Sequence, residues 1–152
     1  MLRRPLVAIP IYVLTLYGWH LTFMFEGALE NPVLHALQHQ SFVVASLLVW
    51  WPALEPKRRR LRGELWKIGH IIGARLAGMF LGMAFIVLRE PAYGAYGNSA
   101  RSHGLSPIAD QQLAGGMMLG LDLIVMLTAL GFFFWRASQD HDRASAATVT
   151  AR

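Results

Sequence analysis

The sequence contains no cysteine and little charge. Without cysteine among its 152 residues, the chain can form neither a disulfide nor a thiolate metal site, so only histidine and methionine remain as ligands for a soft metal ion. Charged residues make up 15% of the chain, against roughly 25% in a typical soluble domain. In contrast, 55% of the residues are hydrophobic. This balance predicts an integral membrane protein.

Four apolar segments are long enough to cross the hydrocarbon core of a bilayer, which takes about 20 residues. They cover about residues 5–25, 31–54, 64–88 and 107–136. The second and fourth begin with Asn31-Pro32 and Ser106-Pro107, and a capping residue followed by proline is typical of a helix start. We therefore predict an all-α integral membrane four-helix transmembrane bundle as one domain over residues 1–136. Residues 137–152 are small and polar, which predicts a disordered cytoplasmic tail.

The positive charge is concentrated between these segments. A net charge of +5 could indicate a nucleic-acid partner, but the basic residues follow the rule that cytoplasmic loops are rich in lysine and arginine. Eleven of them lie in the amino terminus, in residues 55–67 and in the tail, whereas only Arg89 and Arg101 lie on the opposite side. We therefore predict no nucleic-acid binding, and a multi-pass membrane protein with both termini in the cytoplasm.

Ionisable residues within the spans are costly and mark functional sites. His20 lies near the outer end of the first span, and His35 and His39 lie in the first two turns of the second, on one helix face. Asp110 and Gln111 open the fourth span, again at its outer end. Topology thus predicts one outward-facing polar layer. Methionines that could share this layer are Met24, Met83, Met117 and Met118.

Imidazole and thioether groups together favour copper, above all Cu(I). In that interpretation His20, His35, His39, Met24, Met117 and Met118 are the candidate ligands, and Asp110 and Gln111 support them from outside. Two other interpretations stay open: a b-type haem held between histidines of a helical bundle, and a structural subunit or scaffold of a respiratory complex whose polar layer serves helix packing. No nucleophile–base pair or phosphate-binding loop is visible, so no enzymatic activity is predicted.

A second polar group lies near the middle of the membrane. At 1.5 Å per residue, Arg75 is roughly 16 Å and Asp122 roughly 21 Å from the cytoplasmic end of its span. Facing each other, they would offset the cost of burying two charges. Small residues recur every four positions on the same two spans, which favours close helix packing. They are Ala74, Gly78 and Gly82 on the third span, and Gly116 and Gly120 on the fourth.

Several strings resemble the bacterial multi-span cytochrome c oxidase assembly factors of the CtaG type. They are Trp19-His20-Leu21, His35-Ala36-Leu37-Gln38-His39, Trp50-Trp51-Pro52 and Asp110-Gln111-Gln112-Leu113-Ala114-Gly115. The resemblance covers most of the chain and corresponds to the carboxy-terminal portion of longer members. It implies a plasma-membrane protein that matures haem–copper oxidase through its copper centres, with oxidase subunits as partners.

The same resemblance points to His20, His35, His39, Asp110 and Gln111 as the residues that matter. Two departures bear on the ligand set: Thr22 replaces a common proline, and Met118-Leu119-Gly120-Leu121 replaces a Met-Trp-x-Pro string. A second copy of the chain or a separate partner subunit would then complete the ligands.

Overall fold

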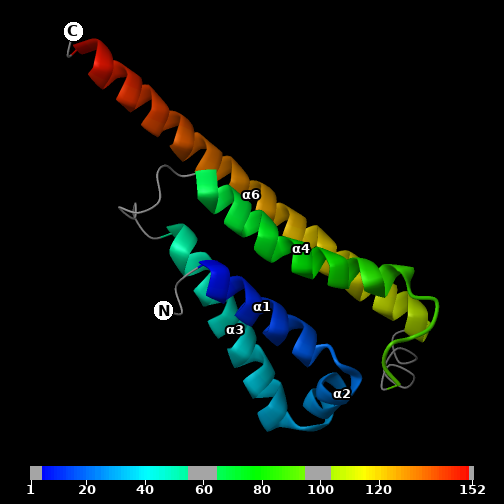
Figure 1. Ribbon diagram of the computed structural model, residues 1–152. Coiled ribbons are helices and arrows are strands. Elements are labelled where there is room, and N and C mark those ends of the chain that lie inside the picture. Colours follow the sequence, from blue (N-terminus) through cyan, green and yellow to red (C-terminus); the bar gives the residue numbers. More distant parts are fainter. Residues whose placement is uncertain (1–4, 55–64, 95–103, 151–152) are drawn as a thin grey trace.

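The structure, a computed structural model, describes residues 5–54, 65–94 and 104–150. Helices account for nearly all of this part of the chain, which confirms the all-α prediction there (Figure 1). The helices are α1 (Pro5–Trp19), α2 (Thr22–Glu30), α3 (Pro32–Leu54), α4 (Leu65–Val87) and α6 (Pro107–Thr150).

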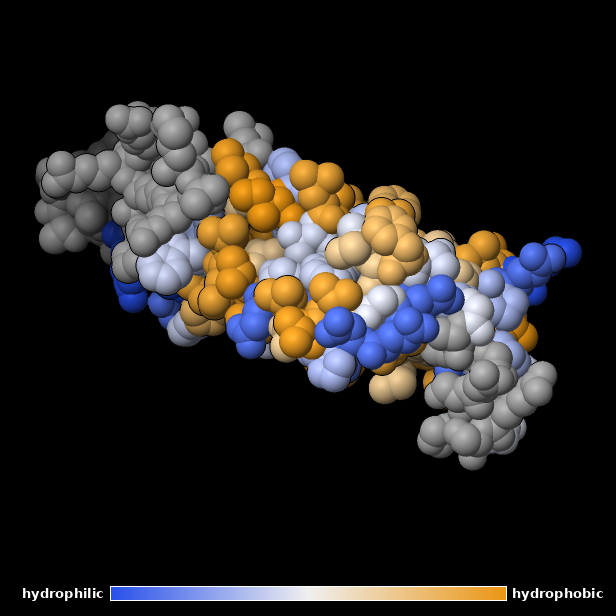
Figure 2. Space-filling view, turned by 90° about the horizontal axis from the view of Figure 1, so that it is seen from below, coloured by the Kyte–Doolittle hydropathy of each residue, from blue (hydrophilic) through white to orange (hydrophobic). Residues whose placement is uncertain are grey.

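Three helices are long and apolar enough to cross a membrane: α3, residues Trp66–Val87 of α4, and residues Pro107–Gln139 of α6. The α1–α2 pair makes a fourth span if the two helices are counted together. Only 11% of the most apolar window of α6 is buried within the protein, and orange apolar side chains cover much of the face in Figure 2. Since such a surface is unfavourable in water, lipid is the solvent that suits it.

The helices form two antiparallel pairs rather than a symmetrical bundle. In Figure 1, α1 lies along α3, and α4 lies along α6. The backbone of α4 also approaches α1 and α3, whereas α6 approaches no described helix except α4. A four-helix bundle, in which each helix touches two neighbours, is therefore not confirmed.

Both predicted capping residues act as expected. The Asn31 side-chain oxygen accepts hydrogen bonds from the backbone N–H groups of Val33 and Leu34, at 2.9 and 3.3 Å. The Ser106 hydroxyl accepts one from the N–H of Ala109, at 3.2 Å. Each cap satisfies amide groups that the first helical turn leaves without a partner, which fixes the start of α3 and of α6.

The prediction of one continuous first span over residues 5–25 is wrong. The helix ends at Trp19 and restarts at Thr22, and the two parts meet at an angle of 68°. Gly18 lowers helix propensity just before the break, and the His20 imidazole bonds to the backbone carbonyl of Leu16. Since a side chain that bonds to the preceding turn competes with the helical pattern, both features favour a break here.

The prediction of a disordered tail from residue 137 is also wrong, because α6 continues to Thr150. This end of α6 extends beyond the other helices in Figure 1. Alanine has the highest helix propensity of all residues, and the segment 137–150 contains four alanines. A hydrogen bond of 3.3 Å from Arg143 to Gln139, four residues earlier, adds local support.

Helices α4 and α6 meet most closely at Gly82 and Gly115. A Cβ atom on Gly115 would lie 2.7 Å from the backbone oxygen of Gly82, which is too close for a carbon and an oxygen that are not covalently bonded. Gly116 and Gly120, the positions expected from their spacing, have no atom within 4 Å of such a Cβ. The small-residue contact is therefore real, but it lies one position earlier on α6 than the spacing indicated.

Candidate functional site: a cavity at the helix break

The break between α1 and α2 exposes polar backbone that would be costly inside a membrane unless other groups satisfied it. The Tyr93 hydroxyl donates to the carbonyl of His20 at 3.0 Å. The Trp19 indole N–H donates to the Ser41 hydroxyl at 2.6 Å, and the Tyr17 hydroxyl donates to the carbonyl of Ala77 at 3.0 Å. These bonds tie the break to α3, to α4 and to the segment after α4, so its geometry is fixed by the fold.

His20 is the residue at the centre of the break. Its Nδ1 lies 2.7 Å from the carbonyl oxygen of Leu16, and because a carbonyl only accepts, Nδ1 carries the proton. In the neutral ring Nε2 then holds a free lone pair, which is the form of histidine that binds metals. The rings of Phe25, Phe42 and Phe85 surround the imidazole at centroid distances of 5.8–6.2 Å.

The imidazole of His20 lines a cavity of about 130 Å³. The Met118 side chain lines the same cavity, so α1 and α6 contribute one imidazole and one thioether to a shared space whose other walls are largely aromatic. This is the pair of ligand types that the sequence singled out for Cu(I). The remaining lining residues are Phe25, Phe85, Tyr93, Gln111 and Ala114.

His35 and His39 form a separate pair on an exposed face of α3. Their Nε2 atoms are 2.9 Å apart and their ring centroids 4.7 Å apart. Neither residue lines the cavity of His20. Among the described residues no three histidine, aspartate or glutamate side chains are close enough to hold a metal ion together. The structure thus divides the three histidines of the predicted layer between two places.

The other predicted ligands are also divided. Met117 is 59% exposed and points away from the cavity that its neighbour Met118 lines. Met24 is half-buried in α2 and Asp110 is half-buried in the first turn of α6, and neither contributes to the lining. Of the six predicted metal ligands, the cavity brings together His20 and Met118.

Gln111 lines the cavity, but its hydrogen bonds go to backbone groups instead of an imidazole. Its side-chain oxygen accepts from the N–H of Ala92 at 2.6 Å, and its amide donates to the carbonyl of Phe85 at 3.3 Å. Gln112 likewise donates to the carbonyl of Ile86 at 3.1 Å. These carbonyls belong to the last turn of α4, which has no helical partners for them. The two glutamines therefore cap α4, a role that the sequence analysis missed.

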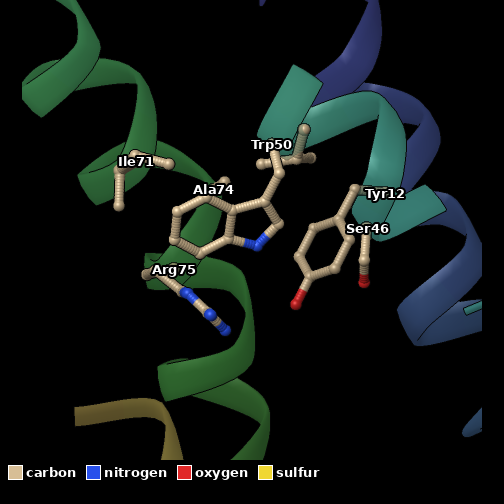
Figure 3. A pocket seen from close by; sticks show the side chains of 7 residues that line it. Tyr12, Ser46, Trp50, Ile71, Ala74 and Arg75 are labelled. Atoms are coloured by element: carbon tan, nitrogen blue, oxygen red, sulfur yellow. The ribbon is translucent and has the colours of Figure 1, made fainter. Parts of the chain in front are cut away.

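Arg75 and Asp122 form the predicted ion pair, from Nη1 to Oδ1, in the middle of α4 and α6. The Tyr12 side chain of α1 lines the same pocket as these two residues. Figure 3 shows Tyr12 and Arg75 beside the Trp50 indole, and the guanidinium carbon is 5.8 Å from the centroid of the Trp50 ring. Opposite charges, a hydroxyl and an aromatic face thus satisfy one another near mid-membrane.

These features define a class of protein: an apolar helical membrane protein with a fixed helix break and a small histidine–methionine cavity. Over residues 1–140 the sequence matches the family described as cytochrome c oxidase caa3 assembly factor. The chain belongs to this family, in agreement with the resemblance seen in its sequence motifs. No curated protein and no solved structure matches it closely enough to add a further relative.

Proposed function

We propose that the protein assists cytochrome c oxidase assembly by handling Cu(I) at the outer face of the plasma membrane, and that oxidase subunits receive the ion. The observation that carries the proposal is the cavity at the helix break. There, the Leu16 carbonyl fixes the tautomer of His20 and the Met118 thioether lines the same space. Cu(I) accepts few ligands and prefers soft ones, so an imidazole and a thioether suit it.

The exposed pair of His35 and His39 supports transfer of the ion rather than storage. Two imidazoles four residues apart can hold a metal ion between them, but two ligands leave coordination positions open. The pair is exposed, so ligands from an oxidase subunit or from a second copy of the chain can reach it. In this scheme copper is the cargo, and no catalytic chemistry is required of the chain.

The test is Cu(I) binding by the purified full-length protein in detergent, measured in competition with a Cu(I) chelator under reducing conditions. His20→Asn is the informative variant, since its amide can still donate to the Leu16 carbonyl while Nε2 is lost. Met118→Leu removes the thioether at nearly constant volume. We expect each variant to weaken Cu(I) binding at least tenfold.

Met117→Leu is the matched control, because the adjacent thioether is 59% exposed and lies outside the cavity. It should bind Cu(I) like the wild type. A His35→Ala, His39→Ala double variant separates the two places: it should keep the cavity-bound ion and slow its release to an oxidase copper-site peptide. Equal Cu(I) affinity in the wild type and in the His20→Asn and Met118→Leu variants would remove the cavity from the proposal.

The haem interpretation has less support. A bis-histidine haem needs two imidazoles that face each other across the cofactor, whereas His35 and His39 do not line the cavity of His20. That cavity, at about 130 Å³, is also smaller than the roughly 300–1,000 Å³ that drug-sized ligands occupy.

A further inference from the structure

A larger cavity lies away from the helix break, between the last turns of α3 and the middle of α6. Its volume is about 360 Å³. Thr128 carries the single hydroxyl of its lining, and that hydroxyl already donates to the carbonyl of Ile124 at 2.8 Å. An apolar ligand therefore suits the space. The lining residues are Trp50, Leu54, Ile124, Val125, Thr128, Ala129, Phe132 and Phe133.

The length of this cavity matches that of a hydrocarbon chain. Its lining residues on α6 run from Ile124 to Phe133, about 14 Å along the axis at 1.5 Å per residue. That length is about half of the hydrocarbon thickness of a bilayer, which is the depth of one leaflet.

Positive charge stands at one end of the cavity. The guanidinium carbon of Arg136 is 5.8 Å from the centroid of the Phe132 ring, and the ammonium of Lys67 is 5.5 Å from that of Phe133. Both rings belong to the lining. Trp135 beside them is 56% exposed, and tryptophan is typical of the level of the lipid headgroups.

The distribution of basic residues assigns this end of the molecule to the cytoplasm, where the leaflet carries anionic lipids. A guanidinium is suited to a phosphate because its planar N–H groups match two phosphate oxygens. Arg136 follows Phe132 by one helical turn, so it lies past the lining of the cavity in the direction of the headgroups.

We propose that this cavity binds one acyl chain of an anionic phospholipid, whose phosphate contacts Arg136. The site is independent of copper handling and lies on α3 and α6, the two long helices that do not approach each other through their backbones. A lipid chain seated there fills the space between them with apolar atoms.

The test is native mass spectrometry of the full-length protein, delipidated in detergent and then titrated with phosphatidylglycerol or phosphatidylcholine of identical chains. We expect the wild type to retain one phosphatidylglycerol about tenfold more tightly than one phosphatidylcholine. Arg136→Gln should abolish this preference, whereas Arg143→Gln, two turns further along α6, should leave it unchanged. Equal retention of both lipids by the wild type would overturn the proposal.

A second pair of variants tests the chain-binding part. Thr128→Phe places a ring in the cavity and should lower retention of both lipids about tenfold. Leu127→Phe is the control, because Leu127 is 57% exposed and outside the lining. Circular dichroism of each variant shows whether the helices are intact. If Thr128→Phe unfolds, the comparison of Arg136→Gln with Arg143→Gln still tests recognition of the headgroup. Unchanged retention in a folded Thr128→Phe protein contradicts the assignment of the cavity.

Discussion

The helix break and the cluster around Arg75 and Asp122, called the mid-membrane cluster below, both place polar groups in an apolar environment. The two regions satisfy these groups in different ways. At the break, neutral side chains satisfy backbone groups that the interruption of the helix leaves unpaired, and the Nε2 of His20 and the sulfur of Met118 have no such task. Near mid-membrane, Arg75 and Asp122 neutralise each other, and Tyr12 lines the same pocket.

The difference between the two regions indicates which one binds a ligand and which one stabilises the fold. The two charges of an ion pair in an apolar environment satisfy each other and are not available to a ligand. Removing one of them leaves the other unpaired, which is costly. A cavity with an imidazole lone pair and a thioether can exchange ligands at small cost to the fold. We therefore assign a structural role to the mid-membrane cluster and ligand binding to the break, and the following changes test that division.

The largest effect is expected for Asp122→Ala. Since it leaves Arg75 without its carboxylate, we expect a loss of about 3–5 kcal/mol in the free energy of unfolding, measured by denaturation of the purified protein in detergent. The Arg75→Ala, Asp122→Ala double variant should be more stable than Asp122→Ala alone. Additive effects of the two single changes would show that the pair does not interact.

The second-largest effect is expected for Gly115→Ala, which should lower the free energy of unfolding by about 3 kcal/mol. The new methyl group would lie 2.7 Å from the Gly82 carbonyl oxygen and force α4 and α6 apart. Both regions depend on this spacing. Gly116→Ala is the control: its Cβ meets open space, and alanine is the better helix former, so its unfolding midpoint should be equal to or above that of the wild type.

Gln111→Ala should lower the free energy of unfolding by about 2 kcal/mol. Gln111 is 1% exposed, so the substitution leaves the Ala92 N–H and the Phe85 carbonyl without their hydrogen-bond partner in the protein interior. Gln112 is exposed and makes one hydrogen bond to α4, so Gln112→Ala should lower the free energy of unfolding by less. Hydrogen exchange in the last turn of α4 should accelerate in the Gln111 variant. If it accelerates equally in both variants, the capping role does not belong to Gln111 in particular.

The smallest effect is expected for Tyr93→Phe, which removes the hydrogen bond to the His20 carbonyl and keeps the ring. Hydrogen bonds in membrane proteins average about 0.6 kcal/mol, so we expect the free energy of unfolding to fall by about 0.6 kcal/mol. Cu(I) affinity should fall less than in His20→Asn, since Nε2 remains. A loss of copper binding as large as that of His20→Asn would mean that the break itself, rather than its ligands, controls the site.

Much of the fold follows from local sequence patterns. The apolar runs of α3, α4 and α6, and the capping by Asn31 and Ser106, need no tertiary information, because hydrophobic length and capping act within one segment. Depth in the membrane also follows from counting residues, which is why the Arg75–Asp122 pair could be expected. The break at His20 was not expected: Gly18 and the His20 side chain favour it locally, but within a membrane it also needs a distant group such as Tyr93 to satisfy the interrupted backbone.

The candidate site shows the same limit. The sequence placed His20, His35, His39 and Met118 at one level of the membrane, but it did not determine which way each side chain turns. Successive residues are rotated by about 100° around a helix, so Met117 faces outward while Met118 lines the cavity, and Gly115 rather than Gly116 touches α4.

Sequence alone thus determined which segments enter the membrane, where α3 and α6 begin and at what depth the polar groups lie, because these depend on the solvent and on neighbours along the chain. Only the tertiary structure decided which groups share a cavity, which glycine makes contact and which side chains cap α4, because these depend on the rotation and spacing of helices far apart in the sequence.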